Sequence, residues 1–130
     1  MLNSNRSMKV IRAAIQSCVL LLLVSCGGGG GSSPPPVNPP QRNVAITWSA
    51  NHEAAVNRTG GGYRVYYSNT PNFAIGSATQ VDVPYVSGPT SPVTNTLTLV
   101  AGTYYIKVVA YSTLNPAGST PSAEIQVVVP

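Results

Sequence analysis

Charged residues are scarce in this chain of 130 residues, where Lys, Arg, Asp and Glu make up 8% against a usual share of about 25%. Disordered chains typically combine high net charge with few β-branched or aromatic residues, and this composition differs on both counts. Good helix formers are also few beyond residue 26, whereas Val, Thr and Tyr are abundant. The composition therefore favours one folded domain of the all-β class and disfavours a disordered chain.

The net charge of +4 comes mainly from one short segment of the chain. Three of the seven basic residues lie within Met1–Arg12, and the part after residue 25 carries four basic and three acidic side chains, a formal +1. A nucleic-acid-binding surface needs Lys and Arg clustered along one face, often with aromatic residues between them. The sequence has no such stripe, so we predict no nucleic-acid partner.

Residues that carry out chemistry are too few to form a familiar catalytic or metal site. The only histidine, His52, stands beside Glu53, while Asp82 and Glu124 lie on separate predicted strands. A hydrolase needs a nucleophile, a base and a group that orients the base, and a metal site needs three or four ligands at suitable spacing. Gly60–Gly62 is followed by no lysine, as a phosphate-binding loop would require. We therefore predict no enzymatic activity, no metal and no cofactor.

The first 25 residues have the layout of a secretory signal peptide. A basic segment, Met1–Arg12, is followed by the mostly apolar run Ala13–Ser25, and then by the glycines Gly27–Gly31. A membrane-spanning helix needs about 20 apolar residues, so this run is too short to cross a bilayer. The sequence predicts a signal peptide over residues 1–25 that is removed during export.

The end of this leader resembles the lipobox of bacterial lipoproteins, carried by Leu23, Val24, Ser25 and Cys26. The resemblance implies that Cys26 receives a diacylglyceryl group, that cleavage precedes it, and that the new amino group is acylated. Two or three acyl chains anchor a protein stably, whereas one gives only marginal binding. Because Gly27 and not Asp follows the cysteine, the resemblance favours the outer membrane of the bacterial envelope, on a face that the sequence leaves open.

Two other interpretations of the leader stay open. An ordinary signal peptide with an incidental cysteine would favour a small residue in place of Leu23. Cys18 is a competing lipidation site, but few apolar residues precede it. If Cys26 is acylated and Cys18 is removed with the leader, the mature chain has neither a free thiol nor a disulfide.

Residues 26–42 are predicted to be the lipidated cysteine followed by a linker. Gly, Ser and Pro dominate this stretch, so it offers no periodic apolar residues to bury. The Gly- and Ser-rich part is expected to behave as a flexible coil spanning roughly 15 Å. The stretch Pro34–Pro40 is expected to be stiffer and to add about 20 Å. The folded domain, residues 43–130, would then be tethered some tens of ångströms from the bilayer.

Apolar and polar residues alternate in six segments of this domain, separated by Gly, Pro and Asn. Such alternation is typical of half-buried strands and fixes their register, because a slip of one residue would turn every apolar side chain outward. The spacing of the segments suits a β-sandwich. The segments are residues 44–49, 63–68, 80–83, 94–100, 103–113 and 123–129.

Domain 43–130 resembles the fibronectin type III family, an immunoglobulin-like β-sandwich of about seven strands. The residues that carry the resemblance are Val44, Ile46 and Trp48, Gly62–Tyr67, Leu97 and Leu99, Gly102–Tyr105, Val108 and Ala110, and Ser119, Ser122 and Val127. The resemblance implies that Trp48 is a core residue and that a corner tyrosine hydrogen-bonds back to the preceding loop. Spacing from Leu99 selects Tyr105 for this role and alternation selects Tyr104, which we prefer. Pro39 and Pro40 stand where the first strand of the family should begin.

A candidate binding surface remains after the core has been assigned. Alternation places several aromatic and basic side chains on the outer face of one predicted sheet, where such groups anchor a protein or stack on a sugar ring. Our lead interpretation is a non-enzymatic envelope lipoprotein that binds an envelope protein. The alternative is a module that binds envelope or extracellular polysaccharide. The residues of this surface are Arg64, Tyr66, Tyr105, Lys107 and Tyr111.

Overall fold

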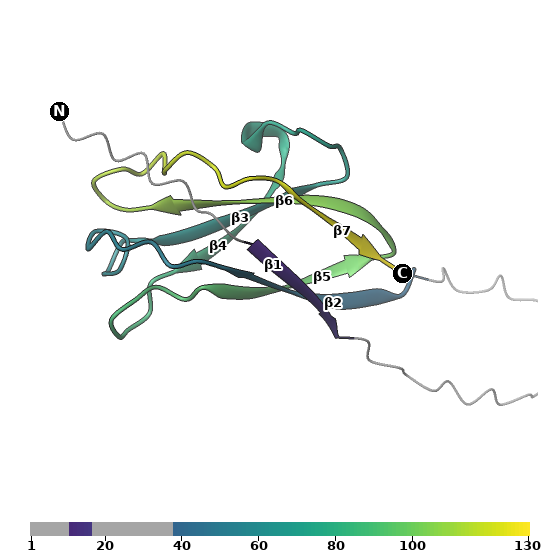
Figure 1. Cartoon of the computed structure of the whole chain (residues 1–130), viewed down its shortest axis with the longest axis horizontal. Coiled ribbons are helices and arrows are strands. Elements are labelled where there is room, and N and C mark those ends of the chain that lie inside the picture. The colour runs from purple at the N-terminus through teal and green to yellow at the C-terminus, as the bar shows by residue number, and fades with distance from the viewer. Residues whose placement is uncertain (1–10, 17–37) are drawn as a thin grey trace, which may run out of the picture.

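The computed structural model describes residues 11–16 and 38–130, which form seven strands in two antiparallel sheets packed as a β-sandwich (Figure 1). One short 3-10 turn, Ile75–Ser77, is the only helical element in this part of the chain. The predicted all-β sandwich is confirmed. In spatial order, the smaller sheet contains β1 (Ile11–Gln16), β2 (Gln41–Trp48) and β5 (Thr94–Val100), and the larger sheet contains β4 (Thr79–Pro84), β3 (Gly62–Ser68), β6 (Gly102–Tyr111) and β7 (Ile125–Val129).

The core lies between the two sheets and is built from alternate residues of the strands, as the period of two predicted. Val44 and Ile46 of β2 face the interior together with Val65 of β3 and Ile106 and Val108 of β6, and none of the five is exposed. Each buried side chain of this kind contributes roughly 1.5–3 kcal/mol relative to an exposed one. The sandwich is therefore held by aliphatic and aromatic packing.

Trp48 is a buried residue of this core. Its side chain is 5% exposed, and its ring meets that of Tyr63 edge to face with 5.3 Å between centroids. Such edge-to-face pairs add about 0.5–1.5 kcal/mol beyond the area they bury. The assignment of Trp48 to the core is confirmed.

The corner before β6 shows which tyrosine faces inward. Tyr104 is buried at 6% exposure, and its ring lies 6.2 Å from that of Tyr67, whereas Tyr105 lies on the opposite face and is partly buried. The inward position of Tyr104 that alternation predicted is confirmed, and its corner hydrogen bond stays a prediction. Alternation decided this position because opposite faces of a strand differ in burial.

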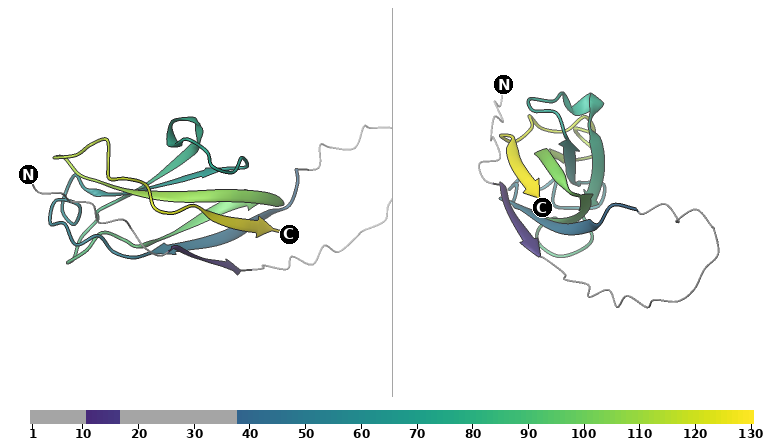
Figure 2. Two further views of the ribbon diagram at one scale, coloured as in Figure 1. Left: turned by 45° about the horizontal axis from the view of Figure 1, so that its top comes forward. Right: turned by 90° about the vertical axis from the view of Figure 1, so that its right-hand side faces the viewer.

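The edge strand β1 is formed by residues of the predicted leader. It runs antiparallel to β2, with Ile11 opposite Trp48 and Gln16 opposite Asn43. It also lies beside β7, at the side of the sandwich where the two sheets meet (Figure 2). The first strand of the sandwich is thus supplied from upstream of the proline-rich stretch, and β2 begins at Gln41, within the predicted linker. Cys18, Cys26 and the linker up to residue 37 lie outside the described residues.

The strand order separates the two ends of the sandwich. Gly62 pairs with Pro84 on one side and with Tyr111 on the other, so the loops 49–61, 85–93 and 112–124 gather at one end, hereafter the distal end (Figures 1 and 2). The start of β2 lies at the opposite end, where Arg42 Nε donates a hydrogen bond to the backbone oxygen of Pro130 over 2.8 Å. The chain from the predicted anchor therefore enters the domain at the end farthest from these loops.

Candidate binding surface

The outer face of the larger sheet is partly covered by the segment between β3 and β4. Tyr66 and Phe73 are each 6% exposed and pack with the fully buried Val109, and Tyr105 packs against them. Alternation placed Tyr66 and Tyr105 on this face correctly. It gave no sign that residues 69–78 fold over them, because that contact is long-range. Tyr66 is consequently part of a second small core and offers almost no surface to a partner.

Lys107 fixes this covering segment in place. Its Nζ donates a hydrogen bond to the backbone oxygen of Phe73 over 2.7 Å and lies 4.5 Å from the centre of the Phe73 ring. It also lies 3.2 Å from Oε2 of Glu124, and the side chains of both residues are 18% exposed. A partly buried cation with these partners stabilises the loop and is poorly placed to meet a ligand.

Glu124 contacts both Lys107 and the covering segment. The backbone N–H of Asn72, a residue in the left-handed region at φ 54°, donates a hydrogen bond to Oε1 over 2.9 Å. This hydrogen bond lowers the pKa of Glu124, and Lys107 lowers it further, against a smaller opposing effect of burial. The carboxylate form is therefore favoured in the folded chain because it accepts hydrogen bonds that the acid form would lose.

Arg64 and Tyr111 form a separate pair near the distal end. The guanidinium carbon lies 4.3 Å from the centre of the Tyr111 ring, and Nη1 donates a hydrogen bond to the backbone oxygen of Pro116 over 2.7 Å. Nε lies 3.3 Å from Oδ1 of Asp82, which also accepts a hydrogen bond from Gln80. Burial raises the pKa of Tyr111, and the charge of Asp82 adds to this effect. One face of the ring is thus occupied by the arginine.

Two large apolar side chains project from the distal end and were missed by the sequence interpretation. Val86 is 75% exposed and Leu114 is 77% exposed. Val86 follows Pro84 by two residues and Leu114 follows Tyr111 by three, and both of those strand ends pair with Gly62. In the sequence, each of the two is an apolar residue inside a polar, turn-rich loop, and this is the pattern that could have indicated an exposed apolar side chain. Only the strand order shows that the two loops share one end.

A pocket of about 160 Å³ opens beside these loops. Tyr111, Ala110 and Val56 form part of its wall, and polar groups from loops 49–61 and 112–124 form the rest. A pocket of this size holds a small group or one sugar ring and falls below the usual range for drug-sized ligands. The polar lining residues are Asn51, Glu53, Ser112, Asn115 and Ser119.

The loops around this pocket are held together by hydrogen bonds. The Asn57 side chain donates to the backbone oxygen of Asn51 over 2.6 Å, and its Oδ1 accepts the N–H of Ser91 over 2.8 Å. Ser91, 1% exposed, donates in turn to the backbone oxygen of Val56 over 2.6 Å. Tyr63 Oη accepts the N–H of Asn51 over 2.6 Å, and burial raises the pKa of its phenol. The distal loops are therefore preorganised, which lowers the entropy lost when a partner binds.

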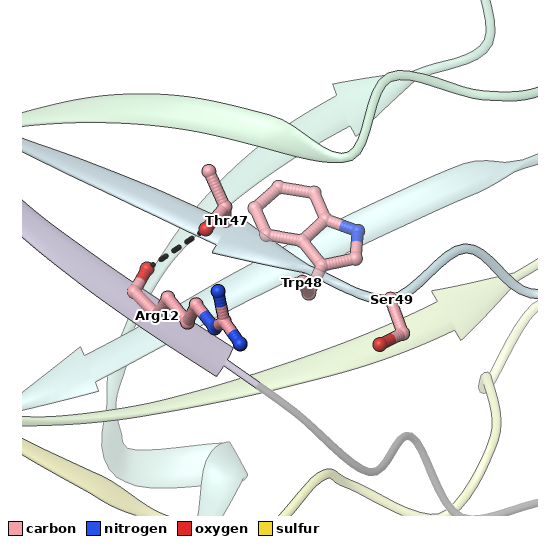
Figure 3. Close-up of a pocket in the computed structure, with 4 residues that line it drawn as sticks. All are labelled: Arg12, Thr47, Trp48 and Ser49. Atoms are coloured by element: carbon pink, nitrogen blue, oxygen red, sulfur yellow. Dashed lines mark hydrogen bonds between the residues drawn. The ribbon is translucent and has the colours of Figure 1, made fainter.

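A second pocket, of about 250 Å³, lies where β1 meets the end of β2. Figure 3 shows its lining residues Arg12, Thr47, Trp48 and Ser49, with Thr47 Oγ1 donating a hydrogen bond to the backbone oxygen of Arg12 over 3.1 Å. Part of its wall comes from β1, so the pocket exists only while that strand is in place.

Within residues 11–16 and 38–130, no three His, Cys, Asp or Glu side chains are grouped so that they could hold a metal ion. His52 is exposed in the loop after β2. The same described residues include no helix with the length and apolar character needed to cross a membrane. The chain matches no protein-family model and no curated protein sequence.

Proposed function

We propose that this chain is a non-enzymatic lipoprotein of the bacterial envelope, whose single sandwich domain binds another envelope protein through its distal end. The observation that carries the proposal is the pair of exposed apolar side chains, Val86 and Leu114, on preorganised loops at the end opposite the predicted tether. Apolar groups of this size on a polar loop contribute little to folding. They gain free energy only when a partner buries them.

The anchor is supported by the order of features along the chain. A basic segment, a short apolar run and the Leu23–Cys26 motif are followed by a Gly- and Pro-rich linker. The domain receives this linker at Gln41, at the end opposite the distal loops. A domain tethered in this way presents its distal loops to other components within reach of the membrane, and outer-membrane placement follows the lipobox resemblance at Gly27.

The fibronectin type III identity belongs to the same proposal. With β1 in place, a sandwich of three and four strands, a core tryptophan on β2 and an inward tyrosine at the start of β6 all fit that family. The β2–β3, β4–β5 and β6–β7 loops of such a sandwich gather at one end, which is a common place for recognition loops.

The test compares distal variants of the processed protein with a matched variant elsewhere. In-cell crosslinking followed by mass spectrometry identifies the captured envelope protein, and that protein is then purified for a binding titration. We expect Val86→Asp and Leu114→Asp each to weaken binding at least about tenfold, the loss expected for an interface anchor worth more than 1.4 kcal/mol. Val128→Asp, at a site 57% exposed on β7, is the control and should bind normally. Equal binding by all three variants would refute the assignment to the distal end.

Polysaccharide binding is the second candidate, and the polar pocket beside Tyr111 favours it. Amide, carboxylate and hydroxyl groups around one aromatic ring form a site that suits a sugar hydroxyl pattern. Titration with envelope glycan fragments should then shift the NMR signals of Asn51, Ser112 and Asn115. Tyr111→Ala should abolish the shifts while Tyr85→Ala retains them. NMR spectra that stay unshifted at saturating glycan would rule out polysaccharide binding at this pocket.

A further inference from the structure

The processing that anchors the proposed lipoprotein also removes one strand of its sandwich. Cleavage before Cys26 separates residues 11–16 from the domain, and these residues form β1, the edge of the smaller sheet. The mature sheet then consists of β2 and β5, with β2 as a new edge. This inference rests on the proposed function because it requires that the leader is removed.

The backbone groups that the new edge leaves unpaired can be identified from the register. The N–H of Trp48 donates to the backbone oxygen of Val93 over 3.0 Å, so Trp48 directs its backbone groups toward the β5 side. Successive residues of a strand alternate in this respect. Asn43, Ala45 and Thr47 therefore point toward β1, and each offers one N–H and one C=O. A row of unpaired backbone N–H and C=O groups along a sheet edge forms a template for another strand.

The rest of the mature chain is poorly suited to fill this place. The segment between Cys26 and β2 holds Pro34–Pro36, Pro39 and Pro40, and proline has no N–H to donate to a ladder. Edges that avoid pairing usually carry charges, prolines or bulges. Asn43–Trp48 has neither a charged residue nor a proline to block strand addition, and the one charged residue of β2, Arg42, lies before this stretch and donates a hydrogen bond to the backbone oxygen of Pro130.

We propose that in the processed protein the β2 edge pairs antiparallel with β2 of a second copy, centred on Ala45. In this register Ala45 stands opposite Ala45 of the other copy, Asn43 opposite Thr47, and Val44 opposite Ile46. The residues with outward-pointing backbone groups then meet one another, which restores hydrogen bonds to all of them. The apolar residues of both copies stay on one face, and the strand order becomes β5, β2, β2, β5.

The predicted tether is compatible with this arrangement. The eight residues of β2 span about 27 Å at 3.4 Å per residue, so two antiparallel copies receive their linkers roughly that far apart. Each linker reaches some tens of ångströms, so both anchors can lie in one membrane. The restriction to a membrane also raises the effective concentration of one copy for another. Both distal ends remain uncovered, at opposite ends of the pair.

A cysteine introduced at the centre of the interface tests the register directly. In a hydrogen-bonded antiparallel pair the Cα atoms are about 5.5 Å apart, within the range that a disulfide bridges. The full-length Ala45→Cys chain is expressed in a diderm bacterium with a radiolabelled fatty acid. The labelled, processed product should run mainly as a disulfide-linked dimer without reductant.

Thr96→Cys is the matched control, because Thr96 is the exposed cross-strand neighbour of Ala45 on β5. It should give no dimer, since the two β5 strands of the pair are three strand spacings apart, about 14 Å, which is too far for a disulfide. A dimer through Thr96→Cys and not through Ala45→Cys would move the contact to the β5 edge and overturn the inference. So would a labelled Ala45→Cys product that stays monomeric with a maleimide-reactive thiol. An unlabelled product that keeps its leader would contradict the proposed anchor as well. The fatty-acid label therefore distinguishes a failure of the anchor from a failure of the β2–β2 contact.

Discussion

Ser122 and Val108 exchange two hydrogen bonds, one of which uses the serine side chain in place of a backbone group. The N–H of Ser122 donates to the backbone oxygen of Val108 over 2.9 Å, and the N–H of Val108 donates to Ser122 Oγ over 3.0 Å. Ser119 and Ala110 repeat the pattern, over 2.7 Å and 3.1 Å. Residues 119–122 thus follow β6 without forming a regular strand, and they fix the last distal loop before β7 begins.

Replacing Ser122 should destabilise the whole domain. Ser122 is 5% exposed, so Ser122→Ala leaves the buried N–H of Val108 without an acceptor. We expect a loss of about 1–3 kcal/mol in the free energy of unfolding, measured by urea denaturation. The control is Thr120→Ala, at an exposed position in the same segment, which should change stability by no more than about 0.5 kcal/mol. Equal stability of the two variants would contradict the role assigned to Ser122.

Trp48 should be the largest single contributor to the core. Trp48→Ala removes the edge-to-face contact with Tyr63 and leaves a cavity, for an expected loss of about 3–5 kcal/mol. Trp48→Phe keeps an aromatic ring and also removes the buried Nε1, for which the described residues provide no hydrogen-bond acceptor. It should therefore cost much less. Thermal unfolding, monitored by circular dichroism, measures the stability of both variants, and a phenylalanine variant as unstable as the alanine variant would contradict the assignment of this stability to an aromatic ring packed on Tyr63.

Acid should weaken the domain through Glu124. Its pKa is lowered in the folded chain from an ordinary value of 4.5, first by the Asn72 N–H and also by Lys107. The contribution of Glu124 to stability is therefore complete above pH 4.5 and is lost as the pH falls through the folded pKa, because the unfolded chain binds the proton first. Urea titrations across this range should show a smaller fall in stability for Glu124→Gln than for the natural chain. Parallel pH profiles would mean that Glu124 is not the group responsible.

Truncating Phe73 should open the covering segment and leave the main core intact. Phe73→Ala removes the ring that packs on Tyr66 and against which Lys107 lies. Hydrogen exchange should increase in residues 69–78 and stay slow in β3 and β6. If exchange rises equally throughout the larger sheet, the second cluster is part of the same cooperative unit as the core.

The strands could be predicted because each has one buried face, and the alternation that buries Val65 and Ile106 is visible in neighbouring residues. Tyr104 followed from the same rule. Contacts between distant segments could not be predicted in this way. The cover that Phe73 places over Tyr66 depends on how a loop folds back, and the shared position of Val86 and Leu114 depends on strand order. The pairing of residues 11–16 with β2 was hidden because their basic and apolar pattern also predicts a leader.

The most direct measurement is site-specific photocrosslinking of the processed, full-length protein in cells. A photoreactive amino acid is placed at Leu114, at Val86, or at the control position Val128 on β7. We predict that the two distal positions capture the same envelope protein and that position 128 does not. Capture of that protein from position 128 alone, or no protein adduct from either distal position in a folded and lipidated chain, would contradict binding through the distal end.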